Sequence, residues 1–312
     1  YANQITRLVC EVNDVLVRGS NMRTTQRRQI TMKPEQIAVV ACVLTFVLLE
    51  IWRTNFFKKS HEKPGDSTVE IFSAIVLALL TQPLVFAGGY ALGSVVAPDS
   101  AGMLGSWPVL AVFGLFLVFD DMSQYGWHRL SHMLPWLYKL HRPHHNAEYM
   151  SVRIVYRNNL FYYLFMPGLW FSGALVYLGG GWVYLFYLPI KMAVICGAHS
   201  DVRWDERLYK IAWLSPLMWV VERTISTPAT HSAHHGRYAS DGITHYHGNF
   251  GNLLFFWDVL FGTAKITRRY PKEFGVENLE ETSTAEQLLW PTVRNSSSIA
   301  VQNDKALDSE TL

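Results

Sequence analysis

The chain has 312 residues, of which 50% are hydrophobic, 14% are aromatic and only 17% are charged. Soluble domains carry roughly 25% charged residues, so this composition is typical of an integral membrane protein. The net charge of +2 is small and no basic run with interleaved aromatic residues occurs, which excludes a nucleic-acid-binding protein. The three cysteines form no CxxC pair, which excludes a disulfide framework and a cysteine-ligated iron–sulfur cluster.

Five apolar segments approach the roughly 20 residues that a membrane-spanning helix needs. In chain order they cover residues 37–57, 69–97, 104–126, 160–178 and 182–198. We therefore predict an all-α, polytopic membrane protein with four to five transmembrane helices and a cytoplasmic helical cap that carries the histidine clusters. The predicted divisions are a polar N-terminal tail (1–34), a transmembrane hairpin (35–103), a histidine-rich domain (104–270) and a polar, largely disordered C-terminal tail (271–312) with one short helix near residues 285–290.

Lysine and arginine gather in two of the loops, around residues 53–63 and 129–157. Because cytoplasmic loops carry an excess of positive charge, these loops are predicted to face the cytoplasm. The histidine clusters then lie on the cytoplasmic side of either a bacterial inner membrane or the endoplasmic reticulum. The segment 203–226 alternates tryptophan with charged residues, so we expect it to lie in the plane of the membrane surface.

Eleven of the twelve histidines fall between positions 128 and 247. The chance expectation for a single HxxHH in this chain is about 0.02, yet two occur. Histidines three or four residues apart share one face of a helix, so each cluster is predicted to point its imidazoles at a common centre. Nine of these histidines are candidate metal ligands. One of them, His199, lies alone at the cytoplasmic end of the fifth segment. The other eight, in three clusters, are His128 and His132; His141, His144 and His145; His231, His234 and His235.

Nine imidazoles exceed the four ligands that one zinc ion takes, so we predict two metal ions. Imidazole suits iron, copper, nickel and zinc alike, and the ligand type does not select among them. Ligating histidines usually donate their second N–H to a carboxylate or a carbonyl. Carboxylates that are candidates for this role are Asp120, Asp121, Asp201, Asp205 and Asp241. The residues His245, His247 and Asn249 are candidates for an additional ligand or an outer contact, and His61 has no assigned role.

The HxxxH, HxxHH and HxxHH clusters, in this order, resemble the histidine boxes of the fatty acid hydroxylase/sterol desaturase superfamily of membrane di-iron enzymes. Further similarity lies in TPATHSAHHG (227–236) and in GNFGNLLFFWDVLFGT (248–263), which is close to the family's NYG…WDxxFGT ending. The resemblance covers about residues 104–265 and is nearer to the sterol desaturase and alkylglycerol monooxygenase group than to the acyl-CoA desaturases. The interval 240–247 is longer than in many relatives, which leaves the last ligand open.

The resemblance implies that the histidine-rich domain is catalytic and binds two iron ions (Fe²⁺/Fe³⁺). It also implies that O₂ is the co-substrate and that a C–H bond of a lipid of sterol, fatty acyl or alkylglycerol type is hydroxylated or desaturated. The sequence does not distinguish hydroxylation from desaturation, and it does not name the lipid, the electron donor or the oligomeric state.

Such chemistry requires two electrons beyond those of the C–H bond. The sequence has no GxGxxG, no cysteine cluster and no haem motif. We therefore expect a separate electron donor, either a ferredoxin or a small cytochrome with its reductase. Basic residues that are candidates for docking it, or else only mark the cytoplasmic side, are Lys139, Arg142, Arg153 and Arg157.

The alternative is a histidine-rich zinc or metal-handling membrane protein, such as a transporter or a hydrolase. Transport places ionisable residues inside the spans. The predicted spans are interpreted as nearly free of them, with Glu50 at the end of one span and Lys191 in the interior of another, and the histidines lie outside the spans. The sequence therefore favours the oxygenase.

Overall fold

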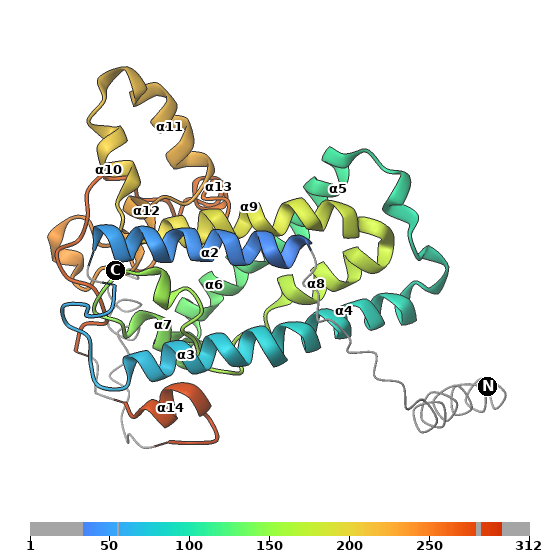
Figure 1. The fold of residues 1–312 in the computed structure, drawn as a ribbon, viewed down its shortest axis with the longest axis horizontal. Helices are drawn as coiled ribbons and strands as arrows, with labels where there is room; N and C mark the ends of the chain where they lie inside the picture. Colours follow the sequence, from blue (N-terminus) through green and yellow to red (C-terminus); the bar gives the residue numbers. More distant parts are fainter. Residues whose placement is uncertain (1–33, 55, 279–281, 295–312) are drawn as a thin grey trace, which may run out of the picture. The chain divides into compact units, whose positions relative to one another are not determined.

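The computed structural model describes residues 34–54, 56–278 and 282–294, which are mostly helical (Figure 1). These residues contain no strand, only an isolated bridge between Gly236 and Phe274. The prediction of an all-α protein is therefore confirmed. The predicted N-terminal tail before residue 34 and the last part of the predicted C-terminal tail lie outside the described residues, and the domain boundaries stay predictions.

Three helical runs in the described part of the chain are long and apolar enough to cross a membrane. They are α3 (Asp66–Val76) with α4 (Gln82–Val96), α5 (Val109–Phe116) with α6 (Ser123–Met133), and α8 (Pro167–Leu175) with α9 (Gly181–His199). A π-helical turn joins the two parts of each run, at Leu77–Thr81, Leu117–Met122 and Val176–Gly180. In the third run the chain reverses at Gly179, whose φ of 104° suits only glycine, so α8 and α9 form a hairpin (Figure 1).

The helix α2 (Pro34–Arg53) packs along α9 (Figure 1). Each of the five predicted apolar segments therefore contains a helix. The fourth differs in its start, because α8 begins at Pro167 and not near residue 160. Residues 160–166 instead form turns, and the Leu160 amide donates to the carbonyl of Leu288 in the C-terminal part of the chain.

The shorter helices follow or surround the spans. They are α7 (Pro135–His145), α10 (Trp204–Tyr209), α11 (Ser215–Thr224), α12 (Pro228–His234), α13 (Phe256–Phe261) and α14 (Thr284–Leu289). The segment 203–226 is divided into α10 and α11 by turns around Ile211 and a 3₁₀ turn at Ala212–Leu214, so it is not one continuous helix. Trp213 and Trp219 on this segment are 79% and 55% exposed, as an apolar face toward a membrane surface requires. The helix expected near residues 285–290 is present as α14.

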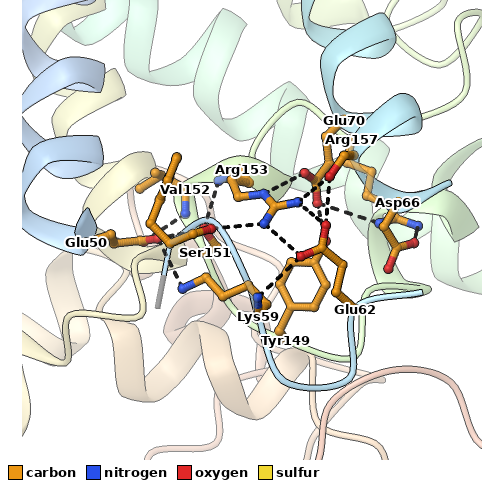
Figure 2. Close-up of polar contacts among 12 residues, drawn as sticks. Glu50, Lys59, Glu62, Asp66, Glu70, Tyr149, Ser151, Val152, Arg153 and Arg157 are labelled. Atoms are coloured by element: carbon orange, nitrogen blue, oxygen red, sulfur yellow. Dashed lines mark hydrogen bonds and ion pairs between the residues drawn. The ribbon is translucent and has the colours of Figure 1, made fainter. Parts of the chain in front are cut away.

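A partly buried polar network ties the segment after the second histidine cluster to α2, α3 and the loop between them (Figure 2). Arg153 pairs with Glu62 at 2.6 Å and with Glu70 at 2.7 Å, and Arg157 pairs with Asp66 at 2.6 Å. Hydrogen bonds from Arg153 lower the pKa of Glu62 to about 2. On the other side, Glu50 accepts hydrogen bonds from the Ser151 hydroxyl and the Val152 amide. The network therefore fixes residues 149–157 against the helices around them.

Burial and ion pairing contradict part of the hypothesis that Lys139, Arg142, Arg153 and Arg157 dock the electron donor. Arg142 and Arg157 are only 2% and 0% exposed, and Arg142 lies 3.8 Å from Glu286 of α14. A buried charge is stable only with its partner, so these two arginines cannot turn outward to a second protein. The guanidinium of Arg153 is likewise engaged by Glu62 and Glu70. The prediction is wrong for Arg142 and Arg157.

Glycines bring α4 and α8 into backbone contact, in the manner of small residues at membrane helix interfaces. A Cβ atom on Gly89 would lie 2.1 Å from the Trp170 carbonyl oxygen, and one on Gly173 would lie 2.2 Å from the Phe86 carbonyl oxygen. We expect Gly89→Ala to lower the free energy of unfolding by about 1–3 kcal/mol, because the backbones must separate.

Thermal unfolding of the detergent-solubilised protein measures this effect. Gly114→Ala in α5 is the control, since a Cβ there meets no atom within 4 Å and alanine is the better helix former. Equal melting temperatures for Gly89→Ala and the unmodified protein would contradict the proposed close packing.

Candidate metal centre

Four helices carry the nine candidate ligands to one place. α6 continues the second membrane run and ends just after His132, and α7 begins at once with Pro135, a residue suited to the first turn of a helix. α12 begins with a capping box, in which the side chains of Thr227 and Thr230 each accept from the other's backbone amide. His199 is the last residue of α9. All nine imidazoles belong to buried residues.

The histidines form two groups, within each of which the ligand nitrogens lie within 4.8 Å of one another. The first group is His128, His132, His141, His145 and His234, and the second group is His144, His199, His231 and His235. The second and third sequence clusters are each divided between the two groups. On α7, His141 and His145 face the first group while His144 faces the second. These two clusters therefore each serve two centres and not the single common centre that helical spacing predicts, whereas His128 and His132 of the first cluster both belong to the first group.

The two groups are in direct contact. The ring of His145 from the first group stacks on the ring of His235 from the second group, with centroids 4.4 Å apart and an interplanar angle of 17°. The rings of His144 and His235 also lie close, at 4.6 Å within the second group. Neighbouring residues of one short helix therefore reach both groups, which keeps the two centres adjacent.

The Nδ1 atoms of five of the nine histidines point away from the centres, toward carbonyl oxygens. His128 Nδ1 lies 2.7 Å from the Phe250 oxygen, and His234 Nδ1 lies 2.8 Å from the Gly248 oxygen. In the second group, His144 and His199 lie 3.0 and 2.8 Å from the oxygens of Ile154 and Ile195. A carbonyl oxygen accepts but does not donate, so each of these Nδ1 atoms carries the proton.

The protonation of Nδ1 leaves unprotonated Nε2 atoms facing one another. The Nε2 atoms of His128 and His234 are 3.0 Å apart, and those of His144 and His199 are 3.3 Å apart. Neutral imidazoles with Nδ1–H have only a lone pair at Nε2, so neither pair can form a hydrogen bond. Two nitrogens bound to one ion at about 2.0–2.1 Å lie about 2.9–3.4 Å apart, which matches both pairs. One such pair occurs in each group, so the donor atoms fit two metal ions.

Burial keeps the imidazoles outside the spans neutral, which is the form that binds metals. Desolvation by the surrounding protein is the largest cause, and neighbouring histidines add to it. It lowers the pKa well below the ordinary 6.5 at His141, His144, His145, His231, His234 and His235.

Comparison with known proteins agrees with this geometry. A profile of the family "Fatty acid hydroxylase" matches residues 113–263, which contain all nine histidines. These residues, just under half of the chain, therefore match the fatty acid hydroxylase family. The resemblance to the fatty acid hydroxylase/sterol desaturase superfamily is confirmed.

Individual relatives of this fatty acid hydroxylase domain include alkylglycerol monooxygenases. The chain is 28% identical to the protein from Danio rerio over 148 residues, 26% identical to that from Homo sapiens over 145 residues and 24% identical to that from Xenopus tropicalis over 153 residues. Each match covers 46% of this chain but only 28% of the relative. No solved structure gives a significant match to the chain.

In the fatty acid hydroxylase domain, Asp121 and Asp258 hold the loop that follows the third cluster. Asp121 accepts from the Trp257 indole at 2.8 Å and from two backbone amides, those of Leu253 and Leu254. Asp258 accepts from the Phe250 amide at 2.8 Å and from Gly251 at 2.6 Å. These bonds place the Phe250 carbonyl against His128. Trp257 and Asp258, the WD pair of the sequence, therefore position the histidine centre indirectly, by fixing the backbone of this loop.

Asn249 joins the third cluster to the segment after α13. Its amide group donates to the carbonyls of Thr230 at 2.8 Å and Lys265 at 2.9 Å, and its backbone adopts a left-handed φ of 58° that asparagine tolerates. His245 and His247 lie outside both histidine groups. The backbone amide of His245 donates to Ala233, and the ring of His247 packs on Tyr246. A role of these three residues toward a metal stays a prediction.

The other candidate carboxylates have partners of their own. Asp201 pairs with Lys59 at 2.9 Å, and Asp120 pairs with Lys191 at 2.7 Å. Asp205 accepts from the Ala229 amide and from the Tyr270 hydroxyl, so it holds the start of α12. Asp241 accepts from the amides of Ile243 and Thr244, two and three residues later. The partners found for the histidines are instead mostly backbone carbonyls.

Sequence reasoning missed three residues that contact the histidines directly. The Oδ1 atom of Asn158 accepts from His141 Nδ1 at 2.9 Å. Tyr162 stacks on His141, with centroids 4.8 Å apart. The Phe250 ring lies 5.3–5.5 Å from His128, His132 and His234. No spacing pattern marks them, because they come from loops that only the fold brings to the centre.

A cavity of about 100 Å³ leads from the histidines into the helix bundle. His128 and His141 of the first group and His144 and His199 of the second line one part of it. The rest is mostly apolar and aromatic, and side chains that represent it are Leu77, Tyr162, Met166, Leu188, Met192 and Ile195. Both centres therefore open onto one shared, mostly apolar space.

We expect a chelator to lower the melting temperature of the protein and added Fe²⁺ or Zn²⁺ to restore it. Ions between the facing lone pairs bind only the folded chain, and a ligand at 100 times its Kd stabilises by about 2.7 kcal/mol. Differential scanning fluorimetry with metal analysis measures both effects.

The double variant His128→Ala/His234→Ala removes one facing pair and should lose the metal of the first group. The exposed His61→Asn is the control, because asparagine tolerates its left-handed φ of 67°. If the protein contained no metal, and neither the chelator nor added ions changed its melting temperature, the proposal that the two histidine groups bind two metal ions would be contradicted.

Proposed function

We propose that the protein is a membrane lipid oxygenase. It hydroxylates or desaturates a C–H bond of a lipid, with O₂ as co-substrate, two iron ions at the two histidine groups and electrons from a separate protein. The single observation that carries the proposal is the pair of adjacent, buried imidazole groups with facing lone pairs. The fatty acid hydroxylase family match and the names of the alkylglycerol monooxygenase relatives support it.

The histidines account for the position of the two metal ions, and the family match accounts for the choice of iron. Imidazole suits iron among other divalent metals, and the family match favours iron over zinc or copper. When bound, a pair of iron ions supplies the activation of O₂ and the removal of hydrogen from an unactivated carbon. His128, His132, His141, His145 and His234 would hold one ion, and His144, His199, His231 and His235 would hold the other.

The carbonyl contacts at Nδ1 give this centre its rigidity. His128, His144, His199 and His234 each donate from Nδ1 to a backbone oxygen, which fixes both the tautomer and the orientation of the ring. The donors therefore stay directed inward without rearrangement of side chains, so the ions occupy fixed positions relative to the cavity.

The cavity determines which substrates can react. Its apolar lining next to His128, His141, His144 and His199 fits a hydrocarbon chain and leaves little room for bulk water. Exclusion of water protects a reactive centre from side reactions and holds the substrate carbon beside it. A lipid reaches such a cavity most directly from the membrane, and the three apolar helical runs support a membrane location.

We expect His144→Ala and His234→Ala each to abolish lipid oxidation, because each removes a ligand from a different group. Membranes from cells that express the protein are supplied with ¹⁸O₂, and extracted lipids are analysed by mass spectrometry for one gained ¹⁸O atom or two lost hydrogens. Both variants should remain in the membrane fraction, since α3 to α9 are unchanged at their lipid-facing surfaces.

His61→Asn serves as the matched control and should keep full activity. Lipid oxidation that persists at the level of the unmodified protein in either ligand variant would contradict the proposed function.

A further inference from the structure

A second polar layer lies deeper in the helix bundle than the histidines. Its centre is the ion pair between Lys191 Nζ of α9 and Asp120 Oδ2 of the second run, 2.7 Å apart, with both side chains less than a tenth exposed. Asp120 precedes His128 by eight residues and Lys191 precedes His199 by eight. At a rise of 1.5 Å per residue, both helices place the layer about 12 Å from the histidine layer.

Two further side chains of the layer lack protein partners. Gln124 is one helical turn from both Asp120 and His128, and its Oε1 is buried with no hydrogen-bond partner among the described residues. Ser172 of α8 is 1% exposed, and its hydroxyl is likewise without a partner in the described part of the chain. All four residues line the same cavity as the histidines. Unpartnered buried polar groups destabilise a fold, so these groups mark a place where a ligand binds.

The chemistry of the layer selects the ligand. The charges of Lys191 and Asp120 compensate each other, so the layer offers no net charge to an anion. Gln124 Oε1 is an acceptor and needs a donor, and Ser172 can donate or accept. A carboxylate or a phosphate has no hydrogen to donate and would lie against Asp120. A neutral hydroxyl group satisfies both free side chains.

We propose that Gln124 and Ser172, beside the Lys191–Asp120 pair, bind the hydroxyl group of a neutral lipid alcohol. The inference rests on the proposed function and narrows its substrate class to uncharged lipids that carry a hydroxyl group. The hydrocarbon part extends along the apolar lining toward the histidines. Gln124 precedes His128 by one helical turn and Asp120 precedes it by two, so the oxidised carbon lies about 6–12 Å from the hydroxyl oxygen.

Binding to the full-length protein in nanodiscs tests this assignment without any turnover. Tritiated 1-hexadecanol is the probe, and 1-methoxyhexadecane and hexadecanoate compete with it, each expressed as a mole fraction of the bilayer. We expect the alcohol to bind roughly tenfold more tightly than the methyl ether, because only the alcohol donates a hydrogen bond to Gln124. Hexadecanoate should bind most weakly.

Variants separate recognition from a structural role. Gln124→Leu should remove the tenfold preference for the alcohol while it leaves binding of the ether within twofold, and Ser172→Ala should reduce the preference. Ser94→Ala is the matched control, since its hydroxyl is exposed and already bonds to the Ala91 carbonyl. Equal binding of alcohol and ether by the unmodified protein, equal losses for both ligands in Gln124→Leu, or tightest binding of hexadecanoate would each overturn the assignment.

Product analysis distinguishes this inference from the proposed function. A preference for the alcohol without any oxidised lipid under reducing conditions with O₂ would contradict the proposed function and support the hydroxyl site. Oxidation of lipids with no preference for the alcohol would support the proposed function and overturn the hydroxyl site.

Discussion

Two pairs of unprotonated imidazole nitrogens, His128 with His234 and His144 with His199, face one another at 3.0 and 3.3 Å inside the protein. Lone pairs at this distance repel unless a cation lies between them, and burial denies them water. The carbonyl contacts at Nδ1 hold the rings in this arrangement. The remainder of the structure either brings these four side chains together or prevents them from turning away.

Much of the polar interior holds these four histidines in place indirectly, by fixing the backbone segments that contact them. The network of Arg153 and Arg157 with the acidic residues of the α2–α3 region fixes the segment whose Ile154 carbonyl orients His144. Asp121 and Asp258 fix the loop whose Phe250 carbonyl orients His128. Several charged residues that the sequence suggested for docking or for contacts to the metal ligands thus stabilise the backbone inside the protein. Their burial requires partners, and the partners define the backbone around the centre.

The π-helical turn at Leu117–Met122 links the two polar layers of the bundle. The additional residue in the turn allows the adjacent carboxylates Asp120 and Asp121 to face different inward partners, Lys191 and the 253–257 loop. One helical run therefore carries Asp120 of the proposed hydroxyl-binding layer, Asp121, which bonds to the 253–257 loop, and, eight residues after Asp120, the candidate metal ligand His128. In the proposed function, the spacing between the layers would set the distance between the hydroxyl group and the oxidised carbon of the lipid.

Composition and short-range pattern were sufficient for the helical membrane fold, the five apolar segments and the nine candidate histidines, because hydropathy and helical spacing are local properties. They also predicted the short helix near residue 285. Three features depended on the tertiary structure: the division of each HxxHH box between two groups, the burial of Arg142 and Arg157, and the contacts of Asn158, Tyr162 and Phe250. Each arises from packing between segments up to about 140 residues apart. Local sequence spacing does not specify which of two neighbouring centres a side chain will face.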